Sequence, residues 1–410
     1  MTKQKRFITI LLLGLLTAIV PFSIDMYLPG FPDIAASFGT TVTRVALSLS
    51  SFFVGIGIGQ LIYGPLLDRF GRKKPLYVGL VLYCVASVAC VYMHSIEALI
   101  ALRFIQALGA CAANIAAIAM VRDFFSPEEN AKIFSFLILV LSVSPMLAPT
   151  TGGYLTAAFG WSSIFILLTA ITVLIGLGVF FFLPESKKGD TRYSLRISSI
   201  ARSYATVFKE PYFKVYTFLS SIALASLFTY IASSPGVFMQ HFALTQKQYG
   251  FLFAFLASGL IIASQINTLL LKRFKSESII RGALLTQLLF GASLFLSSVL
   301  HLDSFWTVAI LLFGYLASAG LIMPNATALA MKPFEQNAGS ASALLGFIQM
   351  GLGSVTTILI GVFNIGTVLP MGFSILVCSL AGVSILYFSR KVIGASTLPM
   401  PDATNVTEAA

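Results

Sequence analysis

Long apolar runs, separated by short polar segments, recur along almost the whole chain. A helix needs about 20 residues to cross roughly 30 Å of hydrocarbon. Runs of about this length predict helices near residues 7–29, 44–67, 74–93, 98–121, 131–158 and 162–183. A second set is predicted near residues 213–239, 247–271, 279–300, 304–330, 338–363 and 367–390. The pattern predicts an all-α integral membrane protein with twelve transmembrane helices.

The longest polar stretch, rich in Lys and Arg, divides these helices into two sets. It predicts an N-terminal six-helix half at 1–185, a cytoplasmic linker at 186–212, a C-terminal six-helix half at 213–391 and a cytoplasmic tail at 392–410. The halves echo each other: residues 114–120 (NIAAIAM) resemble 325–331 (NATALAM), and 66–70 (LLDRF) resemble 270–274 (LLKRF). Pseudo-symmetric six-helix halves are typical of transporters that bind substrate near the bilayer midplane.

Composition supports the membrane prediction. Hydrophobic residues make up 57% of the chain and charged residues only 10%, whereas a soluble domain carries about 25% charged residues. The net charge of +11 does not indicate nucleic-acid binding, because the basic residues lie in alternate loops and not on one water-exposed face. We expect a multi-pass protein of the bacterial inner membrane, and the distribution of basic residues predicts that both termini lie in the cytoplasm.

Signals of catalysis are missing from the sequence. There is no GxxxxGK[ST] phosphate loop and no HExxH zinc motif. The four cysteines, Cys84, Cys90, Cys111 and Cys378, fall in predicted helices without paired spacing. We therefore expect no enzyme activity, no cofactor and no metal site, and a chain that functions as a monomer.

Asp25 is the sharpest functional candidate, because it is the only acidic residue placed within a predicted hydrocarbon-spanning helix. Arg103 lies at a similar predicted depth in the fourth helix. Burial disfavours the charged form of a carboxyl and a nearby arginine favours it, so a pair of this kind can load and release protons. Two structural alternatives remain: a permanently ionised pair, or an arginine bonded to backbone carbonyls of the first helix.

Residues 64–74 (GPLLDRFGRKK) closely resemble the signature loop of the major facilitator superfamily, and residues 103–109 (RFIQALG) resemble the fourth-helix motif of that family. Gly64 and Gly71 are expected to permit close backbone approach and a tight reversal. For Asp68, the resemblance implies a latch that holds the halves closed on the cytoplasmic side. The complete candidate gating set is Gly64, Asp68, Arg69, Gly71, Arg72, Arg122 and Asp123.

The fifth predicted helix contains a motif that resembles the antiporter signature of the same superfamily. Its small residues and prolines suit a hinge between the halves, although small-residue packing alone also explains the pattern. The candidate hinge residues are Ser144, Pro145, Ala148, Pro149, Gly152 and Gly153. With the acid and proline pattern of the first helix, this motif resembles most closely the Bcr/CflA, or bicyclomycin-resistance, type of drug:proton antiporter.

A pocket for drug-sized ligands is usually apolar with a few placed polar groups. The residues expected to line it lie on helices that face the predicted cavity: Met26, Tyr27, Asn114, Met146, Tyr230, Phe238, Gln265 and Asn325. For each aromatic residue or methionine, a place in the packed core is the simpler alternative.

The expected function is proton-coupled export of small drug-like molecules, lipophilic and either neutral or monocationic, by alternating access. Its partners are then the small-molecule substrate, protons and the lipid bilayer. Proton-coupled import of a small nutrient on the same fold is an alternative, and a membrane receptor or scaffold without transport is a remote one. Direction and substrate depend on resemblance more than on the residues.

Overall fold

The computed structural model describes residues 3–190, 196–334, 338–362 and 367–389. Twelve helices within these ranges are long and apolar enough to cross a membrane, as the hydropathy pattern predicts. The first six spans are α1 (Lys3–Asp25) with its continuation, α3 (Val42–Phe70), α4 (Lys73–Val91), α5 (Ile96–Phe124), α6 (Pro127–Phe159) and α7 (Ser162–Phe182). The last six are α9 (Pro211–Ser234) with its continuation, α10 (Gln246–Leu270), α11 (Ser276–Val299), α12 (Phe305–Met331), α13 (Ala338–Val362) and α14 (Val368–Phe388).

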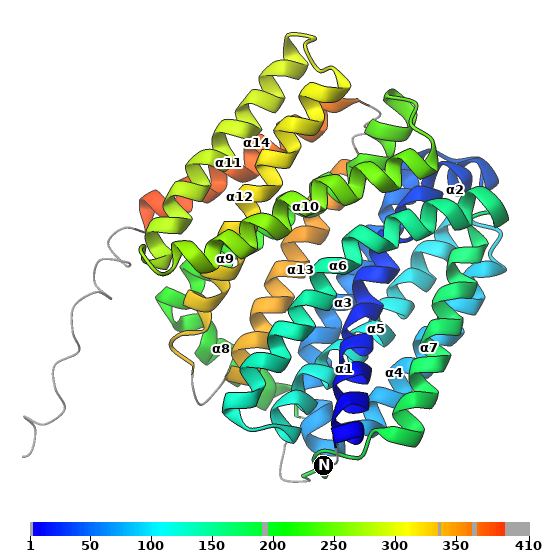
Figure 1. Cartoon of the computed structure of the whole chain (residues 1–410), viewed down its shortest axis with the longest axis vertical. Coiled ribbons are helices and arrows are strands. Elements are labelled where there is room, and N and C mark those ends of the chain that lie inside the picture. The colour runs from blue at the N-terminus through cyan, green and yellow to red at the C-terminus, as the bar shows by residue number, and fades with distance from the viewer. Residues whose placement is uncertain (1–2, 191–195, 335–337, 363–366, 390–410) are drawn as a thin grey trace, which may run out of the picture.

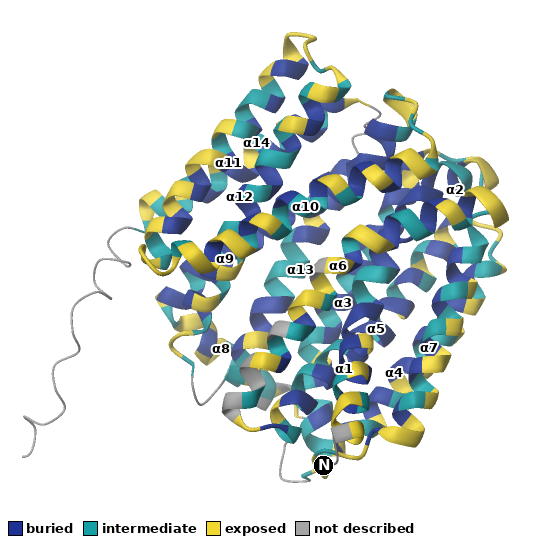
Figure 2. Cartoon of the chain, in the orientation of Figure 1, coloured by how far each residue is buried: buried dark blue, intermediate teal, exposed yellow. Residues whose placement is uncertain are grey.

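The two sets of spans lie side by side (Figure 1). The contacts between them are made chiefly by α3 with α13 and by α6 with α10. Within the first set, α1 packs on α5, α6 and α7; within the second, α9 packs on α12, α13 and α14. Exposed residues cluster on the flanks of the bundle, where lipid would replace water, and buried residues lie between the helices (Figure 2).

Local sequence explains where several helices begin. The Ser126 hydroxyl accepts a hydrogen bond from the Glu129 N–H at the start of α6, and the Glu129 side chain accepts one from the Ser126 N–H. Thr245 and Gln248 form the same reciprocal cap at α10. These caps satisfy N–H groups that have no partner within the helix.

The membrane spans near Asp25 and Ser234 are interrupted. The first helix is predicted to run to residue 29, but α1 ends at Asp25 and is followed by a 3₁₀ turn, Leu28–Gly30, and the short helix α2, Phe31–Ser37. Pro29 has no N–H to continue the α-helical bonds, which explains the break. A π-helical segment, Pro235–His241, likewise extends α9.

Residues 197–209 form a further helix, α8 (Ile197–Lys209), within the stretch predicted only as a polar linker. Its Ser203 hydroxyl donates to the Ser340 hydroxyl on α13 (2.9 Å), and the Tyr204 hydroxyl donates to the Leu61 carbonyl on α3 (3.0 Å). α8 therefore contacts both sets of spans. We call the face that holds α8, the start of α1 and the loop after α3 the basic face, and the other end of the bundle the opposite face.

Candidate transport site

Two cavities lie between the two sets of spans. The larger, of about 660 Å³, reaches the basic face and is lined by parts of α3, α5, α8 and α13. The smaller, of about 100 Å³, lies among α1, α6, α9, α10 and α12. Its lining is apolar except for Asp25 and Tyr230: Pro145, Leu227, Ile231, Phe253, Ala257, Leu260, Ile261 and Leu316. No residue lines both cavities.

Asp25 is the last residue of α1 and is 4% exposed. The described residues place no ion pair on its carboxyl group, and no hydrogen bond to it is found among them. The side chain faces the smaller cavity, with Tyr230 of α9 and Pro145 of α6 in the same lining. Asp25 is therefore a buried acid at the junction of the two sets of spans, without a cation beside it in the described structure.

Arg103 does not form the ion pair with Asp25 that their predicted depths suggested. Its guanidinium donates to the Ser23 carbonyl of α1 (2.8 Å) and to Gln106. Its charge lies over the rings of Tyr27 (4.5 Å) and Phe52 (4.3 Å). The backbone-bonded arginine, the structural alternative from the sequence, is the arrangement observed, because Arg103 turns toward α3 and α7 and not toward the smaller cavity.

Gln106 connects Arg103 to a buried polar network that sequence reasoning missed. The Gln106 amide donates to the Ser87 hydroxyl (2.6 Å), which donates to the Tyr83 carbonyl (2.7 Å). The Tyr83 and Ser23 hydroxyls are 2.6 Å apart. Serines and tyrosines in apolar helices give no periodic signal of their own, so only the packing of α1, α4 and α5 brings these groups together.

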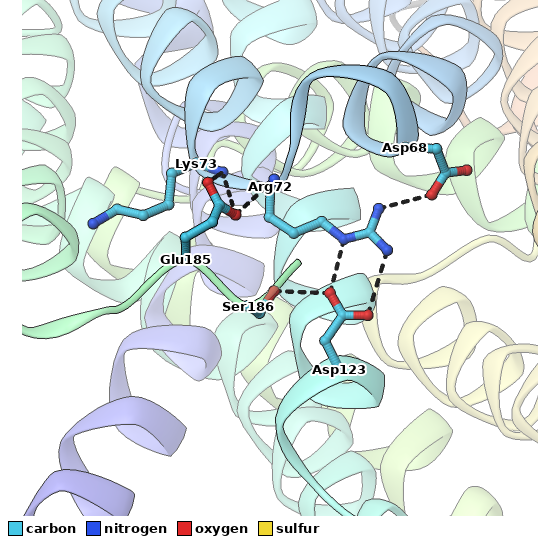
Figure 3. Close-up of polar contacts among 6 residues, drawn as sticks. All are labelled: Asp68, Arg72, Lys73, Asp123, Glu185 and Ser186. Atoms are coloured by element: carbon cyan, nitrogen blue, oxygen red, sulfur yellow. Dashed lines mark hydrogen bonds and ion pairs between the residues drawn. The ribbon is translucent and has the colours of Figure 1, made fainter. Parts of the chain in front are cut away.

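Arg72 is the centre of the network at the basic face (Figure 3). It donates to the Asp68 carboxylate (2.9 Å) and to both carboxylate oxygens of Asp123 (2.8 and 3.4 Å). The Ser186 hydroxyl also donates to Asp123 (2.8 Å). Burial lowers the pKa of Arg72, but the bonds and charges of Asp123 and Asp68 outweigh it and raise the pKa above its ordinary value.

The acids bound by Arg72 both belong to the first set of spans, so this network does not latch the two sets together in the present conformation. Arg122 is exposed and lines the larger cavity. Arg69 lies in the last turn of α3, with its guanidinium 6.0 Å from the Phe70 ring. A closed latch would require these residues to contact the second set of spans across the larger cavity, which is open here.

Gly64 and Gly71 have different surroundings: Gly64 lies within α3, and Gly71 directly follows its last residue. Gly71 has a φ of 84°, a conformation that favours glycine, and a Cβ there would lie 3.1 Å from the Lys187 carbonyl. The expected tight reversal is therefore present at Gly71. Gly64 differs from the expectation: a Cβ there would meet nothing within 4 Å, because Gly64 faces the larger cavity and not a neighbouring backbone.

The opposite face is closed by contacts of the first set of spans with α10. A Cβ on Gly153 of α6 would lie 2.5 Å from the Gln246 carbonyl of α10. Gly152 packs within the first set, where a Cβ would meet the Met26 carbonyl. The Gln246 amide also donates to the Asp33 carboxylate (2.9 Å). Of the other candidate hinge residues, Ser144, Ala148 and Pro149 are buried, and Pro145 lines the smaller cavity.

The predicted pocket residues are scattered over different environments. Asn114 lines the larger cavity and Tyr230 the smaller one. Tyr27 is buried and its hydroxyl lies 2.9 Å from that of Ser48, while Met26 is also buried. Phe238 packs against Phe242 and Phe305. Met146 is exposed and lines neither cavity.

Gln265 points away from both cavities, contrary to expectation. It is exposed on α10, whereas Asn267, two residues later, is buried. The Asn325 amide of α12 donates to the Asn267 side-chain oxygen (2.6 Å). Two residues correspond to about 200° around an α-helix, so Gln265 and Asn267 lie on nearly opposite sides of α10, and the inward amide is Asn267.

Comparison of the sequence with known proteins identifies a family and several relatives. Residues 13–358 match the model of the Major Facilitator Superfamily. The bicyclomycin resistance protein homolog of Haemophilus influenzae is 32% identical over 95% of this chain and 98% of its own length. The chloramphenicol resistance protein of Pseudomonas aeruginosa is 29% identical, over 88% of this chain and 86% of its own length.

Solved structures agree with the family match at the level of fold. The crystal structure of a D-xylose-proton symporter superposes with a TM-score of 0.73 at 14% identity, covering 94% of this chain and 97% of the other. The twelve spans and their packing between two sets of helices agree with this likeness. The chain is a multi-pass membrane transport protein that belongs to the Major Facilitator Superfamily.

Proposed function

We propose that this protein exports small drug-like molecules, neutral or monocationic, across the bacterial inner membrane in exchange for protons. The observation that carries this proposal is Asp25, a buried acid at the junction of the two sets of spans that has no cationic partner among the described residues. The names of the relatives in H. influenzae and P. aeruginosa support drugs as substrates. The basic face is then the cytoplasmic one, as the positive-inside rule expects.

Asp25 couples proton movement to conformational change because its ionised carboxylate is unfavourable when the cavity is closed. An ionised carboxylate in apolar surroundings is unfavourable unless water or a cation reaches it. Opening the opposite face would bring water to the Asp25 cavity and allow protons to exchange with that side. Neutralisation of the carboxyl would permit the cavity to close again, so proton uptake and closure favour each other.

Alternating access requires changes at both faces. The Gly153 and Asp33 contacts with α10 would separate when the opposite face opens. The larger cavity would then close at the basic face, where Asp68, Arg72, Arg122 and Asp123 lie. Pro145 and Pro149 interrupt the hydrogen bonds of α6 and would allow it to bend during this exchange.

The test uses the full chain in liposomes with Asp25→Asn, and Asp303→Asn as a matched acid that lines neither cavity and accepts a local hydrogen bond from Ser298. Chloramphenicol movement is measured with and without an imposed pH gradient. We expect Asp25→Asn to retain exchange without a gradient and to lose accumulation driven by the gradient, while Asp303→Asn retains both. Undiminished pH-driven accumulation by Asp25→Asn would show that another group couples the proton.

The same preparation separates export from import. For an exporter, protons and drug move in opposite directions, so acidification of the compartment at the opposite face should drive chloramphenicol toward that compartment. Movement of drug in the same direction as protons would indicate symport instead.

A further inference from the structure

The larger cavity contains a layer of three carboxamide side chains. Gln60 lies on α3, Asn114 on α5 and Gln349 on α13, so both sets of spans contribute. Counted at 1.5 Å per residue from the helix ends at the basic face, each lies about 15 Å deep. The three amides therefore share one level of the cavity.

These amides are available to a ligand. The structure shows no side-chain hydrogen bond for Gln60 or Asn114 within the described residues, and both are half-buried. The Gln349 amide nitrogen donates to the Ser220 hydroxyl (3.1 Å), and its side-chain oxygen has no described hydrogen-bond partner. Gln60 packs against the backbone of α13, since a Cβ on Gly346 would lie 3.0 Å from its amide carbon.

Charged lining residues lie at a different level. Of the described lining, only Asp68, Arg72, Arg122 and Asp123 are charged, and all are near the mouth at the basic face. Asp68 and Arg122 are each eight residues from an amide on the same helix, or about 12 Å. Arg72 also binds Asp68 and Asp123, so these charges largely compensate one another.

An aromatic pair separates the amide layer from the opposite face. The rings of Phe53 on α3 and Phe228 on α9 stack at 3.8 Å, and Phe228 fits against Gly353 of α13. Phe53 lies seven residues beyond Gln60 on α3, or about 10 Å deeper. Neither ring lines the larger cavity, so the pair lies beyond the amide layer, between it and the opposite face.

We propose that Gln60, Asn114 and Gln349 form a substrate subsite for uncharged solutes that carry several hydroxyl or amide groups. Each carboxamide offers both a donor and an acceptor, and none attracts or repels a net charge. The cavity volume of about 660 Å³ suits a drug-sized molecule. This inference rests on the proposed export function and narrows its substrates toward polar neutral molecules, with the proton site in a separate cavity.

The experiment measures equilibrium binding by calorimetry to the purified full chain in detergent. The probes are chloramphenicol and thiamphenicol, which are uncharged and carry hydroxyl and amide groups, and tetraphenylphosphonium, a lipophilic cation. Gln60→Met, Asn114→Leu and Gln349→Met remove the amides with little change in volume. Gln265→Met is the matched control, because Gln265 is an exposed amide that lines neither cavity.

We expect each cavity variant to raise the Kd of the neutral probes by roughly three- to tenfold, the loss of about one hydrogen bond. Gln265→Met should leave the Kd unchanged, and thermal unfolding verifies that each variant is folded. Folded cavity variants with unchanged Kd, failure of the wild-type chain to bind either neutral probe, or tighter binding of tetraphenylphosphonium would each overturn the subsite. Because no pH gradient is imposed, these outcomes are independent of whether Asp25 couples protons.

Discussion

The first six spans bury a charged group inside the bundle, whereas the buried amide pair described inside the last six is neutral. Arg103 lies among aromatic rings between α1, α3 and α5, while α10 and α12 are joined by the Asn267 and Asn325 amides. At the basic face, Arg72 binds two carboxylates, but the echoing segment has Lys272 in place of Asp68 and Ser276 in place of Arg72. The second copy of this segment thus keeps basic residues, Lys272 and Arg273, but has no acid at the position of Asp68 and no arginine at that of Arg72.

This asymmetry indicates different tasks for the two sets of spans. Asp25 comes from the first set, but most of the cavity that surrounds it is supplied by α9, α10 and α12 of the second. Under the proposed mechanism, the first set holds the acid that takes up and releases protons, and the second supplies most of the apolar wall around it. Movement between the sets changes the surroundings of Asp25 without breaking the ionic network of Arg72.

The largest effect on stability is expected from Arg72→Met. Removal of this guanidinium leaves Asp68 and Asp123 close together without their cation, and the loss of one partner from a buried ionic network costs about 3 kcal/mol or more. Lys272→Met, at the echoing loop, should change the free energy of unfolding by less than about 0.5 kcal/mol because Lys272 is exposed. Unfolding in detergent measures both; equal effects would contradict the asymmetry.

A smaller effect is expected at the neutral pair. Asn325→Leu leaves the Asn267 side-chain oxygen buried without its partner, at a cost of about 1 to 3 kcal/mol. The double variant Asn267→Leu and Asn325→Leu removes both polar groups and should recover most of this loss. Additive destabilisation in the double variant would mean that the amides have roles beyond their mutual bond.

Among the substitutions of buried groups, the smallest effect on stability is expected from Arg103→Met. Arg103 is fully buried and its Nε has no described hydrogen-bond partner, so an apolar side chain avoids its desolvation cost while giving up the ring contacts and two bonds. These contributions oppose each other, and we expect the free energy of unfolding to stay within about 1 kcal/mol of wild type. A loss of several kcal/mol would show that the aromatic enclosure stabilises the fold strongly.

Much of the fold was predictable because crossing a bilayer demands length and apolarity, and both are properties of the local sequence. The spans were placed within a few residues for this reason. The sequence predicted less well which side chains point into the bundle. Because α10 is apolar on most sides, nothing in its pattern distinguished Gln265 from Asn267. α8 was missed because its short amphipathic sequence lies within a polar stretch, although its apolar residues recur at helical spacing.

The candidate site was likewise predictable only in part. Asp25 and Arg103 were found because a charge in an apolar run is conspicuous, but their separation depends on how α1 ends and on which neighbours Arg103 meets. The network of Ser23, Tyr83 and Ser87 depends on three helices meeting, and no single stretch of sequence contains it. The amide layer likewise required the larger cavity to be known.

The contacts of Glu185 indicate when, during synthesis, the first six spans can fold. Its carboxylate accepts hydrogen bonds from the N–H groups of Arg72 and Lys73 directly after α7, and the Asp190 N–H donates to the Asp68 carbonyl. Every partner in this cluster is translated before α8 and α9. Since chains commonly fold from the N-terminus during synthesis, the first six spans can complete their ionic surface while the ribosome is still making the second six.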